Sequence, residues 1–168
     1  RAGFEHVSPA SSKTASPKRV VVVGGGPAGL SAAAEAAARG HRVELYEKSD
    51  TLGGQLNLAG ALEERREFIT LKNTLISKAR RSGAVLHTGV EADRALLERL
   101  KPDAIILASG GSPAAPRIPG IDGANVVQAW DVLAGRADVG ENVVIIGGGA
   151  VGIETGVLIK KMGTLDPH

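Results

Sequence analysis

The stretch VVVVGGGPAGLSAAAEAAARGHRVELYEK (residues 20–48) joins four consecutive valines directly to three glycines. A short, continuous apolar run is typical of a parallel strand that is covered on both faces. The Ala-rich segment 27–39 predicts a helix that ends at Gly40, and the alternating segment 42–47 predicts a second strand. Together they form a β-α-β unit, so we expect an α/β chain with a Rossmann-like, doubly wound sheet.

Three glycines of this stretch, Gly24, Gly26 and Gly29, have G-x-G-x-x-G spacing. The first permits a tight turn from strand to helix, the second lets the backbone approach a pyrophosphate, and the third lets the helix pack on the strand. Glu47 follows the second strand, where a carboxylate can accept hydrogen bonds from ribose hydroxyls. The unit therefore predicts a site for an adenine dinucleotide. The alternative is a glycine-rich turn beside a solvated carboxylate.

The same pattern occurs a second time further along the chain. Residues 142–146 (NVVII) predict a strand, and Gly147, Gly149 and Gly152 repeat the glycine spacing before a helix expected over 150–162. A repeat of this motif predicts a second nucleotide site. Between the two motifs, we expect helices at 67–81 and 95–100, strands at 84–87 and 103–108, and a helical turn at 130–133.

Composition narrows the classes of partner. The 168 residues include 20 basic and 18 acidic side chains, four aromatic ones and no cysteine. This balance leaves no basic patch for nucleic acid or membrane headgroups, and no apolar run is long enough to span a bilayer. The absence of cysteine excludes thiolate metal sites and dithiol chemistry within these residues. We expect a cytoplasmic chain without a metal site, whose electron chemistry comes from a cofactor.

Five motifs carry a resemblance to a known family. They are VVVVGGGPAGLSAA, YEKSDTLGGQLNLA, DAIILASGGSPAAPRIPGI, AWDVLAG and VVIIGGGAVGIETG, and they cover nearly everything from Lys18 onward. The chain resembles the C-terminal FAD- and NAD(P)-binding region of the NADH:flavin oxidoreductases, which include enoate reductase, 2,4-dienoyl-CoA reductase and trimethylamine dehydrogenase. Members of this family carry an N-terminal barrel with FMN and an iron-sulfur cluster. The resemblance implies such a barrel, as a domain or a subunit, as the partner of this chain.

The resemblance also implies cofactor-binding residues. FAD would lie on the first motif, with its pyrophosphate along Gly24, Gly26, Ala28 and Gly29, its ribose at Glu47, and Lys48 nearby. Gly54 and Gln55 would follow the phosphate and ribityl side, Val90 would offer backbone atoms to adenine, and Ala108, Ser109 and Gly110 stand where the family has Ala-Thr-Gly. NAD(P)H would lie on Gly147, Gly149 and Gly152, with Glu154 near the nicotinamide. No side chain is expected to act as a catalytic acid or base.

The implied reaction is hydride transfer from NAD(P)H to FAD, followed by electron passage to the iron-sulfur cluster and FMN of the barrel. The chain would then be one part of a larger oxidoreductase and not competent alone. Disulfide reduction is excluded, because Gln55 to Leu58 and AWDVLAGR stand where related reductases carry cysteine pairs. Two alternatives stay open: a structural ADP- or AMP-binding module, and a docking segment without turnover. The final substrate, the choice between NAD and NADP and the oligomeric state also stay open.

The resulting domain organisation has four parts. Residues 1–17 are expected to be a linker or arm, and residues 18–112 the domain that binds the ADP half of FAD. A Pro-rich connection over 113–140 follows. Residues 141–168 are expected to be the start of the NAD(P)-binding domain, which stops before that domain is complete.

Overall fold

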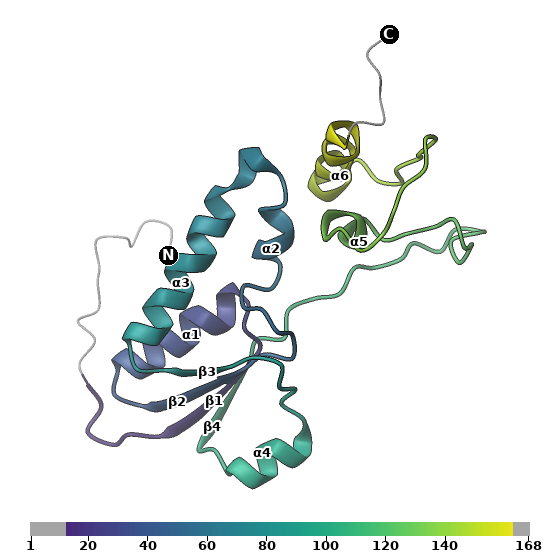
Figure 1. Cartoon of the computed structure of the whole chain (residues 1–168). Helices are drawn as coiled ribbons and strands as arrows, with labels where there is room; N and C mark the ends of the chain where they lie inside the picture. Colours follow the sequence, from purple (N-terminus) through teal and green to yellow (C-terminus); the bar gives the residue numbers. More distant parts are fainter. Residues whose placement is uncertain (1–12, 163–168) are drawn as a thin grey trace. The chain divides into compact units, whose positions relative to one another are not determined.

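The computed structural model describes residues 13–162 (Figure 1). The chain divides into two compact units, one with residues up to 54 together with 71–110, and one with residues 55–70 together with those from 111 onward. Most of the expected arm 1–17 and the last residues of the expected domain 141–168 lie outside the described part.

The first unit contains a four-stranded parallel sheet. Its strands are β1 (Arg19–Val23), β2 (Arg42–Tyr46), β3 (Val85–His87) and β4 (Ala104–Leu107), in the order β3-β2-β1-β4. In the register, Val22 lies opposite Leu45 on β2 and Ile106 on β4. The chain crosses from β3 to the far side of β1 to form β4, so the first glycine turn lies next to the point where the strand order reverses.

Helices cover both faces of this sheet, as Figure 1 shows. Helices α1 (Pro27–Ala38) and α3 (Glu67–Arg81) lie on one face, and α4 (Arg94–Leu100) lies on the other. Alternate residues of β1 face opposite layers: Val20 and Val22 belong to the core under α1 and α3, whereas Val21 packs with Leu96 of α4. A strand buried on both faces needs apolar residues at every position, which explains the run of valines. The predicted doubly wound α/β fold is confirmed.

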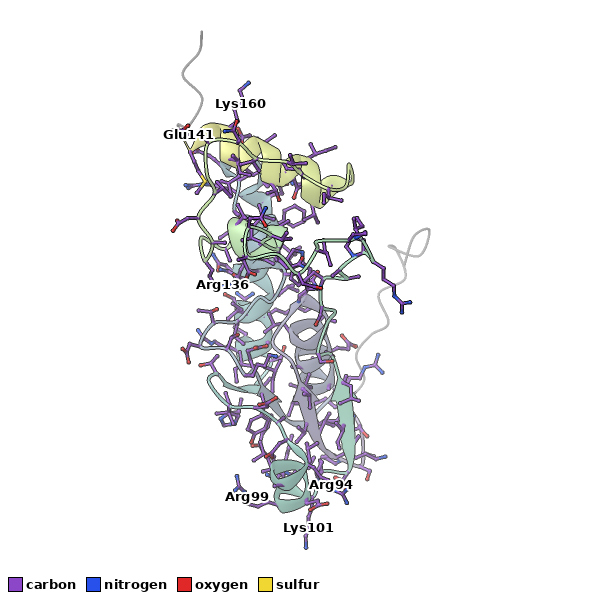
Figure 2. All side chains as sticks on the ribbon, turned by 90° about the vertical axis from the view of Figure 1, so that its right-hand side faces the viewer. Arg94, Arg99, Lys101, Arg136, Glu141 and Lys160 are labelled. Atoms are coloured by element: carbon purple, nitrogen blue, oxygen red, sulfur yellow. The ribbon has the colours of Figure 1, made fainter. Side chains whose placement is uncertain are left out.

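Helix α4 has clear start and stop signals. The Asp93 side chain accepts a hydrogen bond of 2.7 Å from the main-chain N–H of Leu96, as an N-cap should. Lys101 ends the helix in the left-handed conformation, with φ of 47°. Figure 2 shows the charged side chains of Arg94, Arg99 and Lys101 around this helix. The helix therefore turns its apolar side to the sheet and its basic side chains to solvent.

In its described part, the second unit combines helices with long irregular segments and contains no strand. It contains α2 (Leu56–Ala59), the 3₁₀ turn η1 (Glu63–Arg65), α5 (Ala129–Leu133) and α6 (Ala150–Lys161), and the first residues of α3 also belong to it. The strand expected at 142–146 is wrong for this structure: the segment is irregular, and Val144 and Ile146 are 88% and 63% exposed. A parallel strand needs a neighbour to accept its hydrogen bonds, and no described strand pairs with this segment.

Within residues 13–162, no helix is both long enough and apolar enough to cross a membrane.

Candidate nucleotide-binding sites

The turn between β1 and α1 requires two of the three glycines of the G-x-G-x-x-G motif, Gly24 and Gly29, for reasons internal to the protein. Gly24 has φ of +106°, a conformation that side chains disfavour, and a Cβ there would lie 2.3 Å from the carbonyl oxygen of Ala108. A Cβ on Gly29 would lie 1.9 Å from the carbonyl oxygen of Gly24. These two glycines therefore allow β4 to approach the turn and α1 to pack against it.

Gly26 has a different environment. Its φ of −75° is ordinary, and the nearest atom to an added Cβ is the Cα of Gly54, 4.0 Å away. The protein itself thus leaves open the space that a side chain at Gly26 would fill. Gly54, with φ of +51°, faces this space from the following loop. The packing of the protein does not itself require glycine here. A glycine at this position, opposite a second glycine, is what close approach of a pyrophosphate to the main chain would require.

The N-terminus of α1 begins at the same place. Gly26 is its N-cap, no side chain caps it, and Pro27 has no N–H to donate. The next N–H groups along the helix are those of Ala28 and Gly29. Together with the positive end of the helix dipole, these groups suit an anion such as a phosphate.

Glu47 lies at the end of β2 and is bound to the glycine turn. Its Oε2 accepts a hydrogen bond of 2.6 Å from the N–H of Gly25, and its Oε1 accepts bonds of 2.9 and 2.7 Å from the N–H and Oγ of Ser49. Burial of Glu47 works against ionisation, but the hydrogen bonds from Ser49 and Gly25 outweigh it and lower the pKa of the carboxyl below its ordinary value. The side chain is therefore an ionised acceptor beside the turn.

A crevice of about 170 Å³ opens next to this carboxylate. It brings together four predicted site residues: Gly24, Glu47, Lys48 and Ser109. Sequence reasoning missed the other lining residues, which are Val23, Tyr46, Glu91 and Ala92. Glu91 and Ala92 follow β3 in an irregular loop, where no periodicity indicates which side chain faces inward.

The loops after β3 and β4 supply the remaining predicted residues of the first site. The N–H of Val90 donates to the carbonyl of Glu47 at 3.0 Å, so the carbonyl of Val90 is the backbone group that it can offer to a ligand. The N–H of Ala108 donates to Val23 at 2.8 Å, and Gly110 has φ of +76°. Gln55, by contrast, belongs to the second unit.

The second glycine motif forms the same turn as the first. Gly147 has φ of +112°, and Gly149 caps α6 with φ of −77° and ψ of 179°, close to the −75° and −176° of Gly26. A Cβ on Gly152 would lie 2.1 Å from the carbonyl oxygen of Gly147, whereas one on Gly149 would meet nothing within 4 Å. The local sequence thus specifies this turn even though residues 142–146 are not in a sheet.

Glu154 on α6 is paired with Arg65 of η1, and its side chain is only 17% exposed. The Arg65 guanidinium also lies 4.7 Å from the centre of the Phe68 ring. Lys161, at the end of the same helix, pairs with Glu64. Two ion pairs therefore join η1 to α6 within the second unit, and each element supplies the cation of one pair and the anion of the other.

A second hollow in the described part of the chain lies apart from the predicted nucleotide sites. This wider hollow of about 470 Å³ is lined mainly by exposed polar residues of α3 and of the loop after β2, including Asp50, Asn73 and Arg80. None of the predicted site residues lines it. Over residues 13–162, no group of three or more His, Cys, Asp or Glu side chains could hold a metal ion.

Comparison with known proteins identifies the family. Residues 18–165 match the family described as pyridine nucleotide-disulphide oxidoreductase. The chain belongs to this family. Its sequence is 43% identical over 157 residues to a metal reductase from Desulforamulus reducens, covering 91% of this chain and 24% of that protein. It is 48% identical over 150 residues to an NADH oxidase from Thermoanaerobacter brockii, covering 87% and 23%.

A solved structure also resembles this chain. A 2-naphthoyl-CoA reductase in complex with 2-naphthoyl-CoA matches with a TM-score of 0.87 and 34% identity, over 93% of this chain and 24% of that one. The chain thus spans about a quarter of the length of the relatives that it matches. As a member of the pyridine nucleotide-disulphide oxidoreductase family, it is an FAD- and NAD(P)-binding type of redox module. The disulphide in the family's name has no counterpart here, because these 168 residues contain no cysteine.

Proposed function

We propose that this chain is the FAD- and NAD(P)H-binding electron-entry segment of an enoate or 2,4-dienoyl-CoA reductase-like flavoprotein. The observation that carries this proposal is the open space at Gly26, opposite Gly54, at the uncapped N-terminus of α1. Glu47 stands beside the same turn as an ionised acceptor. These features offer an anion site and a hydroxyl acceptor at adjacent positions, as the pyrophosphate and ribose of a dinucleotide require.

At the first site, the chain binds and orients the ADP half of FAD. The backbone from Gly24 to Gly29 approaches the pyrophosphate, and Glu47 accepts the ribose hydroxyls. We assign the Val90 carbonyl to the adenine end, while its neighbour Glu91 and, from the loop after β4, Ser109 line the crevice. Gln55 is proposed on the resemblance alone.

At the second site, Gly147, Gly149 and Gly152 hold NAD(P)H through a turn with the geometry of the first. Glu154 is paired with Arg65, and we assign it to the nicotinamide side of this site. When bound, the nicotinamide and the flavin supply the hydride-transfer chemistry themselves. The contribution of this chain is to bind and position them.

The rest of the enzyme is proposed from the resemblance and from the length of the relatives. A protein of which this chain is about a quarter has room for a barrel that carries FMN and an iron-sulfur cluster. That barrel, as a domain or a separate subunit, would accept the electrons and hold the final substrate. We place the complete protein in the cytoplasm, and we keep 18–112 and 141–168 as the two nucleotide domains.

One structural observation favours a second function. The crevice at Glu47 lies in the first unit and is small, about 170 Å³, so an adenylate alone could occupy it. In this alternative, ADP or AMP is a structural ligand and no flavin is bound.

The test is to incubate the full chain with FAD, remove unbound ligand by gel filtration and record a visible spectrum. Retained absorbance at about 450 nm would support the electron-entry function. Retention of ADP or AMP but not FAD, shown by mass analysis of the released ligand, would support the structural alternative. If neither is retained, both proposals are wrong.

A matched pair of variants makes this test specific. Gly26→Ala should abolish retention, because its Cβ would occupy the ligand's space. Gly140→Ala is the control, since a Cβ there also meets nothing within 4 Å and Gly140 lies outside both motifs.

A further inference from the structure

Ser49 makes two of the three hydrogen bonds that the structure gives to the Glu47 carboxylate. Its N–H lies 2.9 Å and its Oγ 2.7 Å from the same oxygen, Oε1. Gly25 makes the third, to Oε2. The two carboxylate oxygens are thus held from different loops, which fixes the plane of the carboxylate as well as its position.

Ser49 is itself held in place. Its carbonyl accepts a hydrogen bond of 2.9 Å from the N–H of Gly89 in the loop after β3. Its hydroxyl has one proton to donate, and the carbonyl oxygen of Thr51, 2.9 Å away, is a longer alternative acceptor to the Glu47 carboxylate at 2.7 Å. The residue therefore links the loops after β2 and β3 next to Glu47, which lines the crevice.

Fixing this carboxylate in advance favours binding. A glutamate side chain has three rotatable bonds, and ordering such a side chain when a ligand binds reduces the affinity. A carboxylate already fixed by its neighbours does not incur that loss when it accepts a hydroxyl. Any gain from Ser49 should therefore appear only with ligands that offer a hydroxyl to Glu47.

We propose that Ser49 is a positioning residue of the first nucleotide site, which fixes the Glu47 carboxylate to accept the ribose hydroxyls of the bound nucleotide. This inference rests on the proposed function of that site. Ser49 acts through Glu47 and needs no contact with the ligand.

The experiment compares ADP with 2′,3′-dideoxy-ADP, which lacks both ribose hydroxyls, by isothermal titration calorimetry of the full chain. Ser49→Ala should weaken ADP binding about fivefold, the equivalent of one net hydrogen bond, and leave dideoxy-ADP binding unchanged. Ser49→Thr keeps a hydroxyl and should restore ADP affinity. Ser82→Ala is the control, because it removes a hydroxyl that bonds only the Lys78 carbonyl, at 2.9 Å on α3.

The other outcomes separate this inference from the proposed function. If Ser49→Ala weakens both nucleotides equally, or neither, Ser49 has no positioning role. If the unchanged chain binds ADP and dideoxy-ADP equally well, nucleotide binding stands but the inference fails. If the unchanged chain binds neither, the proposed function fails and the inference fails with it.

Discussion

The main-chain N–H of Gly25 donates a hydrogen bond of 2.6 Å to Oε2 of Glu47, 22 residues further along the chain. Gly25 is one of the variable positions of the glycine motif, yet a Cβ there would lie 2.9 Å from the Cβ of Glu47 and 2.6 Å from a methyl carbon of Leu52. Glu47 therefore has a structural role in addition to lining the crevice. It holds the glycine turn in place from outside the motif.

Replacing Glu47 by Gln should reduce ADP affinity by about tenfold or more. The amide would place an NH₂ group against one of the N–H donors of Gly25 and Ser49, and the charge-assisted hydrogen bonds would be lost. Isothermal titration calorimetry measures the change. Glu98→Gln is the control, because Glu98 is exposed and pairs only with Arg94 on α4. An equal effect of both substitutions would contradict the role given to Glu47.

Alanine at two glycines of the first motif should affect different properties: ADP binding at Gly26 and stability at Gly29. Gly26→Ala should abolish ADP binding while lowering the free energy of unfolding by at most about 1 kcal/mol, since its Cβ meets no protein atom closer than 4.0 Å. Gly29→Ala should lower that free energy by about 2 kcal/mol or more, because its Cβ would overlap the Gly24 carbonyl. Urea unfolding and calorimetry together test the pair. A large loss of stability in Gly26→Ala would show that the protein, and not a ligand, requires that glycine.

The second motif offers the same contrast with a different ligand. Gly149→Ala should weaken NADH binding and leave the thermal unfolding temperature nearly unchanged, whereas Gly152→Ala should lower that temperature. Fluorescence of bound NADH reports the first effect, and circular dichroism the second. If NADH binds equally well to Gly149→Ala and to the unchanged chain, the second turn is not a nicotinamide nucleotide site.

Nucleotide binding should depend on pH through Glu47. The pKa of this carboxyl is lower in the folded protein than its ordinary value of 4.5, so its contribution is present above that value and is lost as the pH falls through the lowered pKa. The charged groups that share the crevice are Lys48 and Glu91, and Tyr46 also lines it. The part of the ADP affinity that depends on Glu47 should therefore stay nearly constant from neutral pH down to the ordinary value and decrease only below it, whereas the terminal phosphate of ADP, with a second pKa of about 6, affects the unchanged chain and the Gln variant alike.

Titrations of ADP at several pH values test this expectation, with Glu47→Gln as the comparison. That variant should lack the acid-side decrease, because its amide does not titrate. If the difference in ADP affinity between the unchanged chain and the Gln variant begins to shrink well above the ordinary carboxyl pKa, the carboxylate is not stabilised by its hydrogen bonds. A decrease of the same size in the Gln variant would assign the effect to another group.

The first unit could be predicted from local patterns because burial follows them. The valine run marks a strand covered on both faces, and β1, α1, β2, α3, β3, α4 and β4 all lie within a residue or two of the predicted ranges. The same reasoning failed at residues 142–146. Their apolar pattern is that of a buried strand, but a strand forms only where a neighbour accepts its hydrogen bonds, and the described residues supply none there.

The sequence by itself determined the two glycine turns and the β-α-β unit, because a left-handed glycine and the period of the apolar residues act over a few neighbouring positions. Only the tertiary structure decided which groups gather around the first turn. Parallel strands bring distant loops to one edge of the sheet, so Val90 and Glu91 meet Glu47, and Gly89 meets Ser49, through the order and register of the strands. That order depends on packing across the whole sheet, and no local pattern records it.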